Sequence, residues 1–300
     1  MIETAEEAQV AAVEARAQEW AARSFDHFHP LFHRNPKRSI FAIKAAAELA
    51  LVCGIAATRE TRAAGTSYAA LAERLYREVF LDEGVQEYLL SNIAAVPTIG
   101  LYGSLRQCGY DDLRFRGRLQ RLTESGYPAA VERTPASELD LIHSSRLAGF
   151  PCPLDAGEVY ARTLLRRRPP LQLLANDDVY GITHTVFFLT DFGREMPAVL
   201  RPDLDYLAEA VPRLLDFYLW KQNWDLAAEL LLILKCAGLQ AADSFAEGWA
   251  LLLAAQNDDG SYDGPVDEEP QRADEDTTWA QFRDRYHTTL AVLLAIASAF

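Results

Sequence analysis

The chain has 300 residues, of which 50% are hydrophobic and 24% are charged, as expected for a globular protein with a substantial core. It carries 29 Lys and Arg residues against 43 Asp and Glu residues, so its formal net charge is −14, which argues against nucleic acid or an anionic membrane surface as its main partner. The acidic N-terminus, the interrupted apolar stretches and the scattered cysteines argue against a signal peptide, a spanning helix and a disulfide framework, so we expect a cytoplasmic protein.

Apolar residues recur at helical spacing from one end of the chain to the other. Glycine and proline residues fall between these patterns or at their ends, and no alternating pattern of useful length predicts a strand. In chain order, we expect helices over residues 2–23, 36–58, 67–81, 83–95, 98–107, 111–124, 137–148, 155–168, 178–191, 203–221, 224–238, 243–255 and 277–299.

Two of the later helices, over residues 226–239 and 279–300, are apolar on almost every side. Such a helix must be covered on every side, which favours an inner ring of helices wrapped by an outer one over a four-helix bundle. We therefore predict an all-α fold with a toroid-like arrangement of helical hairpins. The prediction is one domain over residues 1–300, in which an N-terminal helix and a connector rich in His and aromatic residues (1–35) precede the toroid-like body (36–300).

The segment from Gln256 to Tyr262 reads Gln-Asn-Asp-Asp-Gly-Ser-Tyr and resembles the Gln-x-x-x-Gly-x-aromatic repeat of terpenoid cyclases and protein prenyltransferase β subunits. Tyr286-His287-Thr288 follows, and it resembles the Tyr-His-Thr that supplies a zinc-binding histidine in the prenyltransferases. The resemblance covers residues 180–300 and implies an α/α toroid with zinc on His287.

The departures from these families limit what the resemblance implies. Asp225-Leu226-Ala227 keeps the carboxylate of the prenyltransferase Asp-x-Cys pair but lacks its thiolate. The resemblance therefore does not imply ordinary protein prenylation as the activity of this chain. Asp274-Glu275-Asp276 matches the protonating Asp-x-Asp-Asp-Thr run of terpenoid cyclases only in part. The stretch over residues 180–193 also resembles uncharacterised bacterial proteins associated with natural-product gene clusters, which indicates a setting and no reaction.

His184, Asp225 and His287 are the predicted ligands of a zinc ion, because imidazole is the commonest zinc ligand and catalytic sites keep three protein ligands. Asp191 lies on the expected helical face of His184, and Glu229 lies one turn after Asp225. Either carboxylate is a candidate fourth ligand, orienting group or general base. A zinc ion so held acts as a Lewis acid or activates a bound water or thiol.

Two functions from different classes stay open. The first is a zinc-assisted enzyme of natural-product metabolism that acts on an apolar small molecule or a peptide by cyclisation, group transfer or hydrolysis. The second is a non-catalytic helical module that binds a peptide or carrier protein in a central cavity, where the same residues form a buried network. A metal site predicts converging imidazoles, whereas a binding module predicts imidazoles with different partners. A third, weaker hypothesis is a metal-free cyclase that uses Asp274 and Asp276.

Overall fold

The computed structural model describes residues 2–32, 35–58, 67–91, 95–241, 243–265 and 277–299. Within these ranges the secondary structure consists of helices, and no strand occurs. The predicted all-α fold is therefore confirmed.

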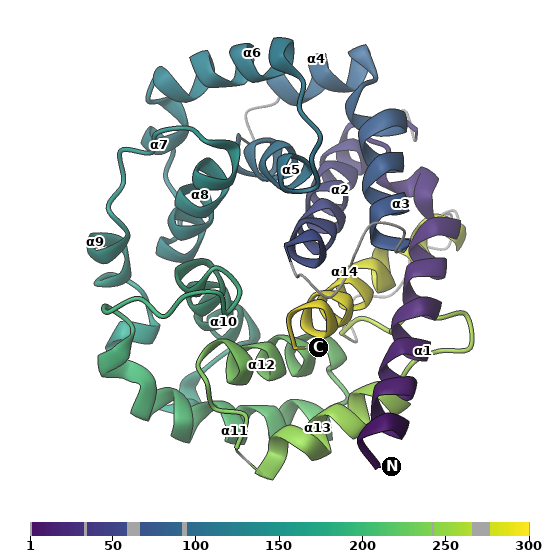
Figure 1. Ribbon diagram of the computed structural model, residues 1–300. Coiled ribbons are helices and arrows are strands. Elements are labelled where there is room, and N and C mark those ends of the chain that lie inside the picture. The colour runs from purple at the N-terminus through teal and green to yellow at the C-terminus, as the bar shows by residue number, and fades with distance from the viewer. Residues whose placement is uncertain are drawn as a thin grey trace.

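Among the described residues, six helices surround the centre of the molecule and contact one another in cyclic order (Figure 1). The last of them in the chain, α14, closes the ring by packing against both α12 and α2. These inner helices are α2 (Pro36–Ala57), α5 (Ala95–Gln107), α8 (Pro135–Ala148), α10 (Asn176–Thr190), α12 (Trp224–Cys236) and α14 (Thr277–Ala299).

The remaining elements lie outside this inner ring (Figure 1). They include α1, which packs against α14 and α3. The outer α-helices are α1 (Ile2–Arg23), α3 (Ser67–Arg74), α4 (Glu83–Ser91), α6 (Leu113–Glu124), α7 (Tyr127–Ala130), α9 (Ala156–Tyr160), α11 (Leu204–Trp220) and α13 (Asp243–Ala254). A π-helical turn (Leu75–Phe80) extends α3, and 3-10 turns occupy Phe25–Phe28, Leu165–Arg167, Leu171–Leu173 and Arg201–Asp203.

The inner helices run parallel to one another, because an outer segment returns the chain between them. Along α5 and α8, Gly100 lies against Ser144 and Gly103 lies against Leu147, so both helices advance in the same direction. Hydrogen bonds between α10 and α12 advance in the same way along both helices. All inner helices therefore start near one end of the ring and finish near the other.

Local signals in the sequence account for several helix boundaries. Asn35 and Asn223 accept hydrogen bonds from backbone amides of the first turns of α2 and α12, and proline follows Asn35 in the first helical position. The predicted helix over residues 155–168 is wrong as a single element. It stops at Tyr160 and is replaced by a 3-10 turn before Arg168, whose left-handed backbone precedes two prolines.

Helix α12 of the inner ring is almost fully buried. Every residue from Asp225 to Leu234 is buried, as the all-round apolar pattern predicts. It packs against α10 and α14 within the inner ring and against α11 and α13 outside it. Each fully buried leucine contributes about 1.5–3 kcal/mol, so this helix supplies much of the core that holds the ring together.

The Gln256–Tyr262 segment joins α1 to α14. The Gln256 side chain donates to the Val13 carbonyl oxygen at 2.8 Å and to the Gly260 carbonyl oxygen at 3.0 Å. The Tyr262 amide donates to Thr289 Oγ1 at 3.0 Å, and its ring is fully buried. These contacts give the segment a structural role in closing the ring.

Of the described helices, only α2 is long and apolar enough to cross a membrane. In the structure, 61% of its apolar stretch is buried within the protein, where it forms part of the inner ring.

Candidate functional site

A cavity of about 600 Å³ is enclosed by residues from all six inner helices described above. Its polarity changes along the ring axis. On α10, α12 and α14 the charged lining residues precede the apolar ones, as His184 precedes Phe188 and His287 precedes Leu290, whereas the α8 lining stays polar from Ser137 to Ser144. Because the helices are parallel, the cavity is polar towards their N-terminal ends and apolar towards their C-terminal ends.

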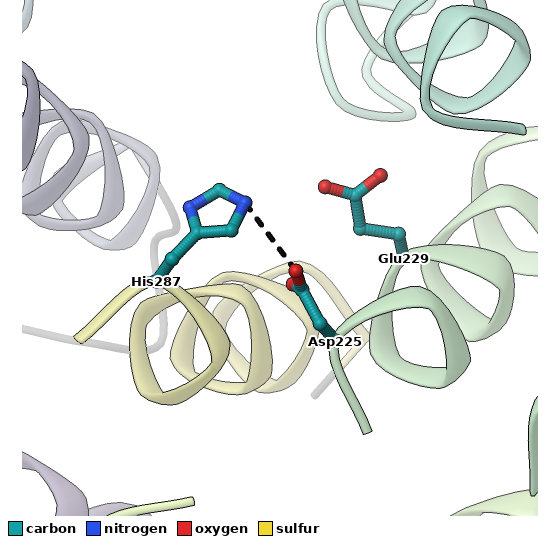
Figure 2. A group of neighbouring side chains, drawn as sticks. All are labelled: Asp225, Glu229 and His287. Carbon is teal, nitrogen blue, oxygen red and sulfur yellow. Dashed lines mark ion pairs between the residues drawn. The ribbon is translucent and has the colours of Figure 1, made fainter. Parts of the chain in front are cut away.

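Three candidate metal ligands meet in the polar half. Asp225 and Glu229 project from successive turns of α12, and His287 projects from α14 towards them (Figure 2). One ligand atom from each lies within 4.8 Å of the others, and His287 Nε2 lies 3.6 Å from Asp225 Oδ2. The structure thus brings together three of the five residues that the sequence singles out.

The other nitrogen of His287 faces α2. Its Nδ1 lies 3.0 Å from Glu48 Oε2, and Lys44 Nζ lies 3.6 Å from Glu48 Oε1. Burial alone lowers the pKa of His287, but the Asp225 and Glu48 carboxylates outweigh it and raise this pKa to about 10. Burial alone raises the pKa of Glu48, but His287 and Lys44 hold it at about 2. In the metal-free site, His287 is therefore an imidazolium between two carboxyl groups.

Asp225 is the least satisfied member of the group. The residue is only 1% exposed, and the Tyr180 hydroxyl donates a hydrogen bond to Asp225 Oδ2 at 2.6 Å. Its Oδ1 is buried without a hydrogen-bond partner among the described residues. Burial raises the pKa of Asp225, and the Glu229 carboxylate adds to this, although His287 opposes both. An unpartnered buried carboxylate oxygen is costly unless a cation or a donor meets it.

His184 does not join the three-residue group directly. Its Nε2 lies 3.4 Å from Glu229 Oε1, and Thr183 donates to the other oxygen, Oε2. Burial alone lowers the pKa of His184, but the Glu229 carboxylate outweighs burial, so the net change is an increase. Conversely, burial raises the pKa of Glu229, and His184 and His287 outweigh this, so the net change is a decrease. His184 and His287 therefore bind different carboxylates.

Asp191 lies apart from this cluster. Helix α10 ends at Thr190, one residue earlier than expected, and Asp191 adopts a left-handed backbone with φ 49°. Its carboxylate accepts a hydrogen bond from His143 on α8 at 2.8 Å and does not line the cavity. The predicted helical face that aligns Asp191 with His184 is therefore wrong, because the helix stops before it reaches Asp191.

Sequence reasoning missed the partners that neighbouring helices supply. Glu48 and Lys44 form an i, i+4 pair within an otherwise apolar stretch of α2. This pair of charges in an apolar stretch is the sequence feature that could have predicted a position near other polar groups. Tyr180 and His143 offered no comparable local signal. Asp274 and Asp276, the acids of the metal-free cyclase hypothesis, lie outside the described residues.

Over the described residues, the parallel inner ring defines an all-helical protein with a cavity that is polar at one end and apolar at the other. The chain belongs to the family described as domain of unknown function DUF6895, whose model matches residues 14–297. No curated protein and no solved structure matches the chain.

Proposed function

We propose that the protein is a metal-assisted enzyme that acts on a largely apolar molecule with one polar end. The observation that carries the proposal is the convergence of Asp225, Glu229 and His287 within 4.8 Å of one another, where Glu229 and His287 line the polar end of the cavity and Asp225 is buried beside them. One imidazole and two carboxylates form a nitrogen and oxygen donor set suited to zinc, and also to manganese or iron. Zinc is the first candidate because three protein ligands plus an open position is its usual catalytic arrangement.

The surroundings of these ligands support the proposal. Glu48 binds the nitrogen of His287 that faces away from the group, as carboxylates behind metal-bound histidines do. Tyr180 and Thr183 fix one oxygen of Asp225 and one of Glu229, respectively. The orphaned Oδ1 of Asp225 is the kind of buried atom that a cation satisfies. A bound divalent ion supplies Lewis acidity or a more acidic bound water.

The shape and polarity of the cavity support the substrate class. A volume of about 600 Å³ suits a small molecule or a short peptide segment. The apolar half carries three phenylalanines, Phe187, Phe188 and Phe192, which suit a hydrocarbon or aromatic portion. A polar end of such a molecule then meets His287 and Glu229. Cyclisation, group transfer and hydrolysis all fit this arrangement.

The same proposal places the chain in cytoplasmic natural-product metabolism and relates it to the α/α-toroid superfamily. The two-layered ring, the Gln256–Tyr262 segment and the position of His287 in the cavity support that relationship.

A second function is a non-catalytic module that binds a peptide or carrier segment. The observation that favours it is that His184 pairs with Glu229 while His287 pairs with Glu48 and Asp225. Imidazoles with different partners are what a satisfied buried network predicts.

Elemental analysis of the protein purified without a histidine tag separates the two functions. The metal-assisted enzyme predicts about one divalent ion per chain in the wild type and its loss in Asp225→Asn and His287→Gln. His143→Gln is the matched control, because it removes a cavity-lining imidazole outside the three-residue group. Wild-type protein that stays metal-free after incubation with zinc, manganese or iron(II) and dialysis overturns the metal proposal and leaves the binding module.

A further inference from the structure

We propose that His143 and Asp191 form a second reactive site in the cavity wall between α8 and α10, where His143 accepts a proton from an O–H or N–H group of the bound molecule and Asp191 positions the imidazole. This site acts without the metal ion, so it stands independently of the proposed metal-assisted function.

The pair is built into the wall between two inner helices. His143 projects from α8 and lines the cavity, although the residue is only 3% exposed. Its Nε2 lies 2.8 Å from Asp191 Oδ1, just beyond the end of α10. Its ring packs against the rings of Phe188 and Phe192 at centroid distances of 5.6 and 5.5 Å. The imidazole is thus held by the Asp191 carboxylate against two aromatic rings, and the buried Asp140 carboxyl, one turn earlier on α8, also interacts with it electrostatically.

Asp191 is itself fixed from several sides. Arg146 Nη2 lies 2.9 Å from Asp191 Oδ1, and Arg194 Nη1 lies 3.4 Å from Asp191 Oδ2. Burial raises the pKa of Asp191, but His143 and the two arginines outweigh it and lower this pKa below its usual range. Because the carboxylate is ionised, it accepts the hydrogen bond, and His143 Nε2 is the donor.

The backbone around Asp191 supports a positioning role. Asp191, Phe192 and Gly193 all have positive φ angles, of 49°, 54° and 83°. Left-handed conformations cost non-glycine residues about 1–3 kcal/mol each and persist where the surrounding structure requires them. Here the left-handed turn brings the carboxylate back to α8 and brings the Phe192 ring against the imidazole.

This arrangement fixes which nitrogen is reactive. In the neutral imidazole, Nε2 carries the proton donated to Asp191, so Nδ1 carries the lone pair. Nδ1 has no hydrogen-bond partner in the part of the chain that the structure describes. A proton passes from the ligand to Nδ1, and the resulting imidazolium is stabilised by the ionised Asp191. The proton returns to product or water when the reaction ends.

The site differs from the candidate metal group in location and in partners. His143 lies near the C-terminal end of α8, beside the phenylalanines, whereas Asp225 and Glu229 lie in the first half of α12. No described contact joins His143 to Asp225, Glu229 or His287. The two polar groups therefore have different direct partners, although the Asp140 carboxyl interacts electrostatically with both His143 and His184, and the Phe188 ring contacts both imidazoles.

A chromogenic ester tests the proposal without knowledge of the natural substrate. p-Nitrophenyl acetate is small enough to enter the cavity. In this reaction Nδ1 of His143 attacks the ester carbonyl, an N–C bond forms, the aryl C–O bond breaks and p-nitrophenolate leaves. Water then hydrolyses the acylimidazolium: the N–C bond breaks, acetate and two protons pass to solvent, and the neutral imidazole is restored with its proton on Nε2. EDTA is present throughout, so a failure of the metal proposal does not affect the result.

We expect p-nitrophenolate release to fall about tenfold or more in His143→Gln relative to the wild type. His29→Gln is the matched control, because His29 lies outside the cavity, on the connector between α1 and α2. Asp191→Asn is expected to lower the His143-dependent rate and to change the proportion of Nε2–H tautomer in ¹⁵N NMR spectra, which a purely structural loss would not do selectively. Equal rates in the wild type and a folded His143→Gln variant overturn the proposal.

Peptide mapping of the wild type after treatment with diethyl pyrocarbonate provides a test that needs no variant. We expect carbethoxylation of His143 in the native protein. If His143 is modified only after unfolding, its Nδ1 is closed to ligands and the proposal is wrong.

Discussion

Replacing Asp225 with asparagine is expected to change the stability of the protein in opposite directions with and without metal. In the metal-free protein, Asp225 is a buried carboxyl whose Oδ1 has no partner among the described residues. Burial and Glu229 raise its pKa, so its ionised form weakens the folded state at neutral pH. Each unit of raised pKa corresponds to about 1.4 kcal/mol. Asp225→Asn removes this charge and keeps an acceptor for Tyr180, so we expect unchanged or greater stability, by about 1 kcal/mol.

When a metal ion is bound, the wild type is expected to be more stable than Asp225→Asn, which reverses the order in the metal-free protein. A ligand that binds only the folded protein stabilises it by about 2.7 kcal/mol at a concentration 100 times its dissociation constant. The wild type is expected to gain about this amount, whereas Asp225→Asn lacks one of three ligands and gains little. The free energies of unfolding of the two proteins therefore cross between EDTA and excess zinc. Urea denaturation followed by circular dichroism measures both free energies.

Asp203→Asn is a matched control because it makes the same chemical change at another buried aspartate. Arg168 Nε lies 2.6 Å from Asp203 Oδ1, and Tyr160 donates to Oδ2. Removing the charge from a buried, well-paired aspartate destabilises by about 3–5 kcal/mol, and this loss is expected with and without metal. The reasoning about Asp225 is refuted if Asp225→Asn loses as much stability in EDTA as Asp203→Asn, or if zinc stabilises the wild type and Asp225→Asn equally.

Three further predictions concern other parts of the structure. Gly260→Ala is expected to lower the free energy of unfolding, measured by urea denaturation, by about 2 kcal/mol or more, because the φ of Gly260 is +88° and a Cβ there clashes with a backbone carbonyl of α1. The control Gly181→Ala has open space around the added Cβ, so its stability should be unchanged or greater. The pairing of His184 with Glu229 raises the pKa of His184 above 6.5. The contribution of this pair to stability is therefore present below pH 6.5 and is lost as the pH rises through the raised pKa. Denaturation midpoints measured across pH should decline over this range, and a flat profile contradicts the prediction. Burial raises the pKa of Cys53, so this thiol should resist a disulfide reagent in the native protein and react only on unfolding, as peptide mapping can check.

The helices could be predicted from sequence because their signals are local. Apolar spacing and terminal glycines and prolines lie within one element, and the predicted helix over 277–299 has the observed bounds. The i, i+4 relation of Asp225 and Glu229 is local in the same sense, and their shared face follows from α12 alone.

The cross-helix partners could not be predicted, because they depend on how the ring closes. Glu48 is 239 positions from His287 in the chain, and Tyr180 is 45 positions from Asp225. No periodicity relates residues so far apart. Asp191 illustrates the same limit at short range, since the left-handed turn over Asp191 to Gly193, after α10, directs its carboxylate to His143 and away from His184.

The charges of the polar cluster bear on how the proposed metal ion would bind. Without an ion, the proton of His287, whose pKa is raised to about 10, supplies positive charge beside the Glu48 carboxylate, and the Glu229 carboxylate raises the pKa of His184. A divalent ion held by Asp225, Glu229 and His287 would replace the proton on His287 Nε2, while Glu48 would keep the proton on Nδ1. The exchange would substitute one source of positive charge for another within the same set of side chains. Binding of the proposed ion would therefore be coupled to proton release.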